Sequence, residues 1–223
     1  MTTTKEHRER LTRERIVEAA LRVMDAEGLD AVTMRRVARE VGVEAMSLYH
    51  HVRDKDDLLG GICSLVMRGF VIPPADLDPA ERARLGAHEW RRLLKAHPNV
   101  VAVFAERKEA MTDIEALLPM EFALDVLRSN GLEERDAVQA FNVIGGYIMG
   151  CVMMEVGRMF SAGATPSDEA SVAPPPDLPA DRLPCIVAAL PYLAACDPDE
   201  QFDYGLDLLL AGIAARVGEN TGA

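Results

Sequence analysis

The sequence contains few aromatic residues: Phe, Trp and Tyr make up 5% of its 223 residues, although apolar residues of all kinds make up 49%. A hydrophobic core must therefore come mainly from Leu, Ala, Val and Met. Such a core suits packed helices better than a β-sandwich, which draws on aromatic and β-branched residues. The composition predicts an all-α protein.

Paired cysteines and catalytic signatures are also missing. The four cysteines, Cys63, Cys151, Cys185 and Cys196, show no C-x-x-C spacing, and we expect reduced thiols rather than disulfides or metal ligands. The sequence contains no G-x-G-x-x-G, G-x-S-x-G or H-E-x-x-H motif. These absences predict a protein that is not an enzyme and that carries no cofactor and no metal.

The N-terminal stretch MTTTKEHRER lacks an apolar run after its charges, which predicts no signal peptide and a cytoplasmic location. Residues 137–154, AVQAFNVIGGYIMGCVMM, lack any charge over 18 residues, which is near the minimum for a membrane span. Gln139, Asn142 and three glycines interrupt this run, and acidic residues flank it. We therefore expect no membrane span but a helix buried on all sides, with a subunit interface on one flank and a core or cavity on the other.

Charge is distributed unevenly along the chain. The net charge is −12, yet residues 1–55 contain 11 Lys and Arg against 10 Asp and Glu, while the remainder contains 13 against 26. We call residues 1–55 the head and residues 56–223 the body. A nearly neutral head with clustered arginines is compatible with a nucleic-acid partner, which the average charge of the whole chain would disfavour.

Capping residues and apolar periodicity predict three helices in the head. Apolar residues recur at helical spacing between Thr12 and Gly28, and Gly28 is a plausible stop. Thr33 can cap a short second helix that ends at Gly42. A third helix is expected to follow and to run to about His51.

The body is also expected to be helical throughout. Asp54 and Asp57 resemble a capping box, and the helix they open should run from Lys55 to Ile72, about 27 Å, before Pro73-Pro74. The proline-rich residues 161–180 are expected to form a flexible loop. Further helices are predicted over residues 79–96, 99–107, 110–129, 133–160, 182–195 and 198–217.

The two short helices over residues 33–51 have the layout of a helix-turn-helix. Apolar residues account for the inner side of the second of these helices, and its outer side carries almost no charge. Small and aromatic side chains of this kind can reach base edges and thymine methyl groups in the major groove of DNA. The adjacent His50 and His51 point about 100° apart on a helix, so they cannot chelate one metal ion together. Nearby cations can neutralise phosphates; these are Lys5, Arg8, Arg10, Arg13, Arg35, Arg36, Arg39, Arg53 and Lys55.

The segment TMRRVAREVGVEAMSLYHHVRDKDDLL resembles the DNA-binding segment of the TetR family of transcriptional regulators. Further along, LRSNGLEERDAVQAFNVIGGYIMGCVMME and FDYGLDLLLAGIAARV resemble the C-terminal domain of the tetracycline-repressor branch. The positions of the head that fall in register with the family pattern are Thr33, Arg35, Val37, Ala38, Gly42, Val43, Leu48, Tyr49, His51, Val52, Lys55, Leu58 and Leu59.

The resemblance implies a helix-turn-helix DNA-binding domain over residues 1–55 and a ligand-binding and dimerisation domain over residues 56–223. It implies a homodimer joined through the helices over 133–160 and 198–217, with a double-stranded DNA operator and a small-molecule effector as partners. By position, Ala45, Met46, Ser47, Tyr49 and His50 would face bases, His51 and Lys55 would contact phosphates, and Thr33 and Arg35 would lie at the backbone or groove edge. The expected function is a repressor released by its ligand; a regulator without an effector, or an activator, remains the alternative.

The body departs from tetracycline-binding members, which use pocket histidines to hold a drug-bound magnesium ion. Val71 and Phe104 occupy the positions at which those histidines align. We therefore expect a fairly apolar ligand rather than tetracycline with magnesium, since pliable methionines suit varied apolar shapes. The candidate ligand-binding residues are Met67, Phe70, Trp90, Phe104, Met120, Asn142, Met149 and Met153.

Overall fold

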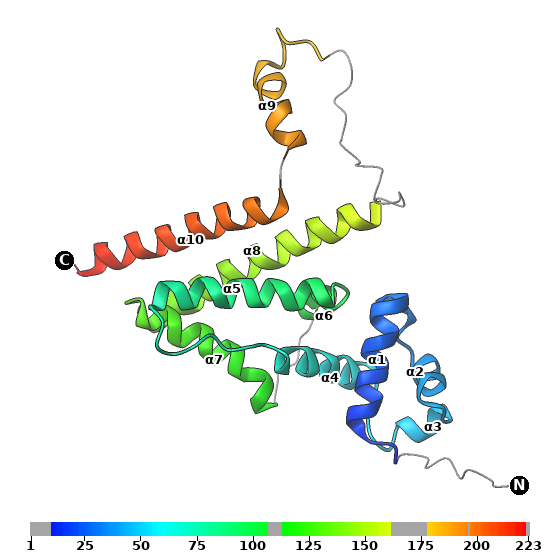
Figure 1. The fold of residues 1–223 in the computed structure, drawn as a ribbon. Coiled ribbons are helices and arrows are strands. Elements are labelled where there is room, and N and C mark those ends of the chain that lie inside the picture. Colours follow the sequence, from blue (N-terminus) through cyan, green and yellow to red (C-terminus); the bar gives the residue numbers. More distant parts are fainter. Residues whose placement is uncertain (1–9, 107–112, 162–177, 196, 222–223) are drawn as a thin grey trace, which may run out of the picture. The chain divides into compact units, whose positions relative to one another are not determined.

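The computed structural model describes residues 10–106, 113–161, 178–195 and 197–221. These residues form ten α-helices and one short 3-10 helix, with no strand among them (Figure 1). The all-α expectation is confirmed. The elements are α1 (Arg13–Glu27), η1 (Leu29–Ala31), α2 (Met34–Val41), α3 (Ala45–Leu48), α4 (Lys55–Arg68), α5 (Pro79–Ala96), α6 (Val100–Glu106), α7 (Ile114–Ser129), α8 (Glu134–Ser161), α9 (Pro184–Ala194) and α10 (Pro198–Thr221).

Threonines cap the first two helices, and the cap of the second, Thr33, is the one that the sequence predicts. The hydroxyl of Thr12 accepts the N–H of Arg15 at the start of α1, and the hydroxyl of Thr33 does the same for Arg36 at the start of α2. Gly42 ends α2 in the left-handed conformation, at φ 75°, which glycine adopts without strain. The basic arm before Arg10 lies outside the described residues.

Two helices end earlier than the sequence predicts. Helix α3 ends at Leu48 rather than near His51, because the chain turns there to bury Val52: the carbonyl of Leu48 accepts the N–H groups of both His51 and Val52. Helix α4 ends at Arg68 rather than Ile72, which shortens the expected rod to about 21 Å.

The early end of α4 follows from the packing of Phe70. The backbone tightens at Gly69 and Phe70 through hydrogen bonds to the carbonyls of Val66 and Met67. The ring of Phe70 then lies 5.8 Å from that of Phe122, measured between ring centroids. A continued helix would direct this side chain elsewhere, so packing decides the boundary.

Contacts divide the chain into two compact units. Unit 1 comprises Met1–Ile72 and Arg92–Phe122, and unit 2 comprises Pro73–Arg91 and Ala123–Ala223. In unit 1, α1 packs against α2 and α4, and the buried residues include Ile16, Met24, Val37, Leu48, Leu58 and Ile62. A side-chain carbon on Gly61 would lie 2.7 Å from Val17, so the glycine allows α4 to cross α1 closely.

In unit 2, α8 and α10 lie side by side. Buried Leu127, Leu132 and Ala137 form a cluster against which Ile213 and Val217 of α10 pack. The other predicted helices of the body are present, with the largest shifts at the start of α7 and at the end of α10, which runs to Thr221 rather than residue 217. Residues 107–112, where α7 was expected to begin, and 162–177, which make up most of the predicted flexible loop, lie outside the described residues.

Candidate nucleic-acid interface and effector site

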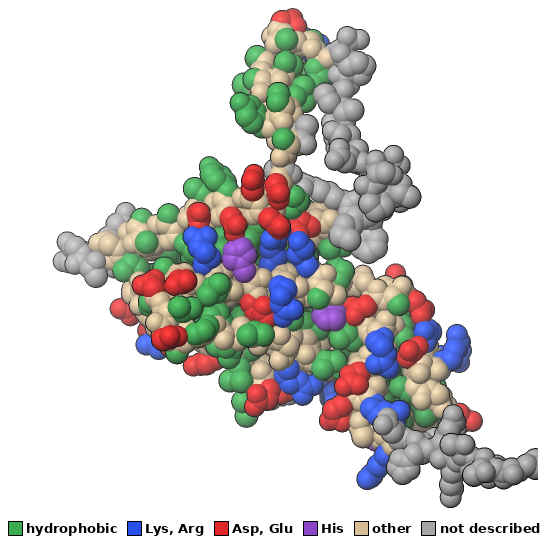
Figure 2. Space-filling model, in the orientation of Figure 1, with side chains coloured by type: hydrophobic (Ala, Val, Ile, Leu, Met, Phe, Trp, Pro, Cys, Tyr) green, Lys and Arg blue, Asp and Glu red, His purple; other side chains and the backbone are tan. Residues whose placement is uncertain are grey.

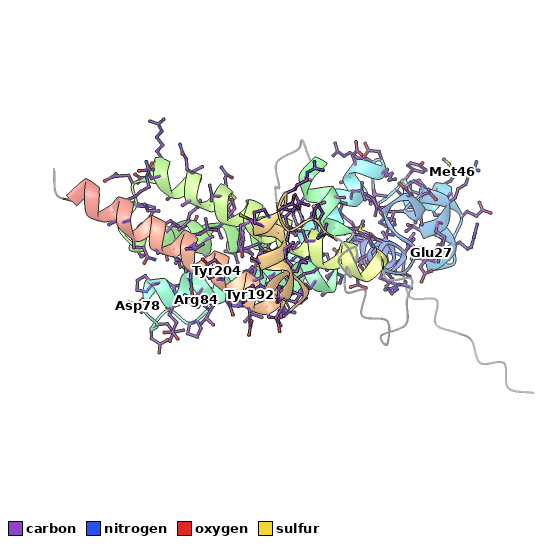
Figure 3. All side chains as sticks on the ribbon, turned by 90° about the horizontal axis from the view of Figure 1, so that it is seen from above. Glu27, Met46, Asp78, Arg84, Tyr192 and Tyr204 are labelled. Carbon is purple, nitrogen blue, oxygen red and sulfur yellow. The ribbon has the colours of Figure 1, made fainter. Side chains whose placement is uncertain are left out.

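The segment over residues 45–51, which we call the reading segment, turns its apolar side chains in two directions. Leu48 is fully buried and anchors α3 in the core of the head. Met46 and Tyr49 are 71% and 47% exposed, and Met46 points away from the head (Figure 3). His50 is exposed as well, while Ala45 and Ser47 are half-buried. This outer side offers an uncharged surface with a thioether and a phenol at its most exposed points.

The four remaining residues of the predicted DNA site are His51, the last residue of the reading segment, and Thr33, Arg35 and Lys55 outside it. Thr33 is exposed, and its hydroxyl is engaged as the cap of α2. Arg35 is exposed in the first turn of that helix, and Lys55 is exposed as the first residue of α4. His51 is half-buried, and its backbone carbonyl accepts a hydrogen bond from Arg13.

Arg36 is a phosphate contact in the sequence-based prediction, but the structure assigns it internal partners. Its guanidinium binds the carboxylate of Glu27 at 2.5 Å and that of Glu40 at 2.9 Å. The hydrogen bond from Arg36 lowers the pKa of Glu27, and the two carboxylates raise the pKa of Arg36. Glu27 and Glu40 compensate the positive charge of Arg36 within the head. Arg36 therefore adds little to the positive electrostatic potential that would attract a phosphate.

Arg13 is the second cation of the predicted phosphate set that the structure assigns internally. Its guanidinium contacts the carboxylate of Asp57 at 2.7 and 3.0 Å. The backbone N–H of Arg53 donates to the same carboxylate at 2.8 Å, while the guanidinium of Arg53 lies 3.9 Å from it. The hydrogen bond from Arg13 holds the pKa of Asp57 below its ordinary value. From the sequence, Asp57 is predicted only as a helix-capping charge, because no local signal reveals a partner 44 residues away.

In unit 2, α5 and α10 are joined by a series of contacts between basic and acidic side chains. The pairs are Arg84 with Asp207, His88 with Asp203 at 2.9 Å, and Arg91 with Asp199 at 2.6 Å. Residue numbers rise along α5 as they fall along α10, so the two helices run antiparallel in a single register. Figure 2 shows the corresponding acidic, basic and histidine side chains gathered side by side on one face.

Arg91 also contacts α8. It is buried, binds Glu155 of α8 at 2.8 Å and lies 4.5 Å from the centre of the Phe202 ring. One guanidinium thus ties α5, α8 and α10 together, in a place where the ion pair is shielded from water.

Helix α8 carries a broad apolar face that unit 2 leaves exposed. Val143 is 55% exposed and Met153 is 61% exposed, and a side-chain carbon on Gly146 or Gly150 would meet nothing within 4 Å. The residues Glu134–Val156 are long and apolar enough to cross a membrane by length and composition, and 17% of their most apolar window is buried. One flank of α8 is therefore exposed in the single chain, and burial of that flank in a subunit interface stays a prediction.

Helix α10 also carries an exposed apolar face. Tyr204 and Leu208 are 69% and 58% exposed, and Ala211 and Ala215 continue the same face at helical spacing (Figure 3 labels Tyr204). Large apolar patches on a protein surface are typical of protein–protein or membrane contacts.

The predicted ligand-binding residues occupy different environments. Met67, Phe70 and Phe104 are half-buried in unit 1, where Met120 is exposed. Trp90 and Met149 are half-buried in unit 2. Asn142 and Met153 lie on the exposed face of α8. A small pocket in unit 2 is lined by Cys151, Met154, Glu155, Pro198, Gln201 and Phe202, and its volume of about 20 Å³ holds about one water molecule.

Comparison with known proteins identifies the family. Residues 16–62 match the model of "Bacterial regulatory proteins, tetR family", and residues 74–217 match "Tetracyclin repressor-like, C-terminal domain". The chain is 32% identical to the HTH-type transcriptional repressor DrrR1 of Streptomyces coeruleorubidus, over 95% of this chain and 80% of that protein. It is 25% identical to the class D tetracycline repressor of Escherichia coli, over 93% of this chain and 91% of that protein.

Among solved structures, the TetR family protein ActR of Streptomyces coelicolor in complex with actinorhodin is similar at a TM-score of 0.81 and 29% identity. The match covers 94% of this chain and 99% of that chain. The match of two family models, together with the helix-turn-helix and the helical body, leads to one conclusion. The chain belongs to the tetR family of bacterial transcriptional regulators, with a C-terminal domain of the tetracycline-repressor type.

Proposed function

We propose that this protein is a transcriptional repressor that binds a palindromic operator as a homodimer and is released by a small, fairly apolar ligand. The observation that carries the proposal is the exposure of Met46 and Tyr49 on an uncharged reading segment, anchored from behind by the buried Leu48. An ordinary solvated helix surface would carry charges at such positions. The similarity to DrrR1, a transcriptional repressor, supports the direction of regulation.

The exposed faces of α8 and α10 support the homodimer. Two copies of these faces would bury each other in a four-helix bundle, and Gly146 and Gly150 would permit close approach of the helices. Such a dimer contains two reading segments. To bind the two half-sites of a palindrome in successive major grooves, they must lie about 34–36 Å apart. The apolar length of α8 is then explained by a partner helix rather than by a lipid bilayer.

The effector is proposed to act at the C-terminal end of α4. Met67 and Phe70 lie there, half-buried, and Phe104 and Met120 belong to the same unit. A ligand that displaces the Phe70 ring from Phe122 would shift the end of the helix whose first turn adjoins the reading segment. Because DNA and ligand would prefer different positions of α4, each would weaken binding of the other by the same factor. The complex of ActR with actinorhodin supports an effector of this general role.

The function is tested by selecting DNA fragments with the purified full-length protein, sequencing them and measuring affinity for the selected site. We expect a palindromic consensus, a complex with two chains per site, and repression of a reporter placed behind that site. Actinorhodin serves as the first effector probe, followed by a panel of apolar compounds scored by thermal shift. An affinity for the site that stays unchanged at saturation with every bound compound would contradict the release mechanism, and activation of the reporter would contradict the repressor role.

A further inference from the structure

The side chain of Arg13 connects three elements of unit 1. It lies at the first residue of α1, where its Nη1 atom donates to the backbone carbonyl of His51 at 3.0 Å. Nη1 and Nη2 also bind the two carboxylate oxygens of Asp57, at 3.0 and 2.7 Å. The start of α1, the end of the reading segment and the first turn of α4 are therefore held by one planar group.

Asp57 closes the turn that follows the reading segment. Its carboxylate accepts the backbone N–H of Arg53 at 2.8 Å, and its own N–H donates to the cap residue Asp54 at 2.8 Å. The turn from His51 to Asp57 is thus hydrogen-bonded at both ends. It contains His51, Arg53 and Lys55, which are all predicted to contact phosphates.

The apolar core alone does not determine the angle of the reading segment. Leu48 and Val52 hold it against the head by burial, which is non-directional and tolerates small rotations. A two-point bond between a guanidinium and a carboxylate is directional and admits one relative orientation. Recognition of base edges is sensitive to rotations of about 10–20°, so a directional tie at this point matters for reading.

We propose that Arg13 and Asp57 are a positioning pair that orients the reading segment and the adjoining phosphate-binding turn for operator recognition. The proposal rests on the proposed role of residues 45–51 in reading DNA. It assigns to Arg13 a function other than the phosphate contact that its position beside a basic arm suggests. It also assigns a function in DNA binding to an acidic residue, although its negative charge by itself repels the phosphates of DNA.

Asp57→Asn separates positioning from simple electrostatics, because the two predict opposite results. Removing a negative charge near DNA strengthens binding to any sequence if charge alone matters. Loss of the tie to Arg13 weakens binding to the selected site instead. We expect Asp57→Asn to lose at least about tenfold in affinity for the selected site, comparable to one mismatched base pair, with no loss on random DNA.

Asp56→Asn is the matched control, since Asp56 is exposed, lies in the same first turn of α4 and loses the same charge. It should bind both DNAs as tightly as the unaltered protein or slightly more tightly. Arg13→Lys keeps the positive charge but cannot form the two-point bond. It should therefore behave like Asp57→Asn, with an unchanged dependence of affinity on salt concentration.

The proposal is overturned if Asp57→Asn binds the selected site as tightly as Asp56→Asn, or if Arg13→Lys matches the unaltered protein. If Asp57→Asn does not fold, as judged by circular dichroism and thermal unfolding, Arg13→Lys alone decides. Failure of the unaltered protein to select any DNA sequence would instead reject the proposed function. The two failures are therefore distinguishable.

Discussion

The phenol ring of Tyr147 on α8 lies where the first side-chain carbon of any larger residue at position 205 on α10 would be. Its hydroxyl donates to the backbone carbonyl of Phe202 at 2.9 Å, and its ring stacks on the Phe202 ring with centroids 5.7 Å apart. The close contact between these two helices thus requires glycine at position 205, for reasons of space rather than of backbone conformation.

Gly205→Ala should destabilise unit 2, although alanine is the better helix former. The overlap with Tyr147 costs about 1–3 kcal/mol, more than the gain of about 1 kcal/mol in helix propensity. Denaturant unfolding of the single variant measures the net change in unfolding free energy from these two effects. In the double variant with Tyr147→Leu the two effects should be strongly non-additive, and additivity of the two substitutions would contradict the contact.

Gly146→Arg tests the dimer face of α8. A side chain at this position meets open space in the single chain, so on a solvent-exposed helix the change should stabilise by about 1 kcal/mol. In a four-helix bundle the same change introduces a charge between helices and should yield monomers in sedimentation experiments. Ser129→Arg, at the exposed end of α7, is the control and should leave the dimer intact. A dimeric Gly146→Arg protein would move the interface elsewhere.

Tyr49→Ala should reduce affinity for the selected operator by about tenfold or more, since one recognition contact accounts for about 1–3 kcal/mol of discrimination. Affinity for random DNA should change little, because phosphate contacts remain. Tyr192→Ala removes a tyrosine from α9 of unit 2 that is also exposed, at 79%, and serves as the control. Equal losses on selected and random DNA would show that Tyr49 does not read sequence.

The salt dependence of DNA binding should report which cations meet phosphates. Lys55→Gln should reduce the slope of log affinity against log salt concentration by about 0.9, the value for one phosphate contact. Arg36→Gln should leave that slope unchanged, because Glu27 and Glu40 already compensate its charge. A slope that falls equally for both variants would mean that Arg36 leaves its carboxylate partners when DNA binds.

The stability of unit 1 should depend on pH through Asp57. Its pKa is lowered in the folded state, mainly by the hydrogen bond from Arg13, so the unfolded chain binds more protons as the pH falls. The stabilisation from this carboxylate is fully present above its ordinary pKa of 3.8 and is lost as the pH falls through the lower folded value. The difference in unfolding free energy between the unaltered protein and Asp57→Asn should therefore shrink below about pH 4. A difference that stays constant down to pH 2 would contradict the ion pair.

Local sequence signals determined the starts of the head helices and the fold class. The hydroxyls of Thr12 and Thr33 bond to N–H groups three residues away, and Gly42 adopts a conformation that few other residues tolerate. These interactions depend on neighbours in the chain, so their positions could be read directly. The motif over residues 33–59 carried the family assignment in the same way.

Interactions between distant residues had to await the tertiary structure. The ends of α3 and α4 depend on the burial of Val52 and on the pairing of Phe70 with Phe122, which no local pattern reports. The internal roles of Arg13 and Asp57 were likewise hidden, because a charge in a sequence does not name its partner. An α-helix can be recognised from bonds within one stretch of chain, whereas a surface exists only once separate stretches have packed. For this reason the sequence alone determined which helices form, and only the packing decided which charges and apolar faces remain available to DNA, ligand and a second subunit.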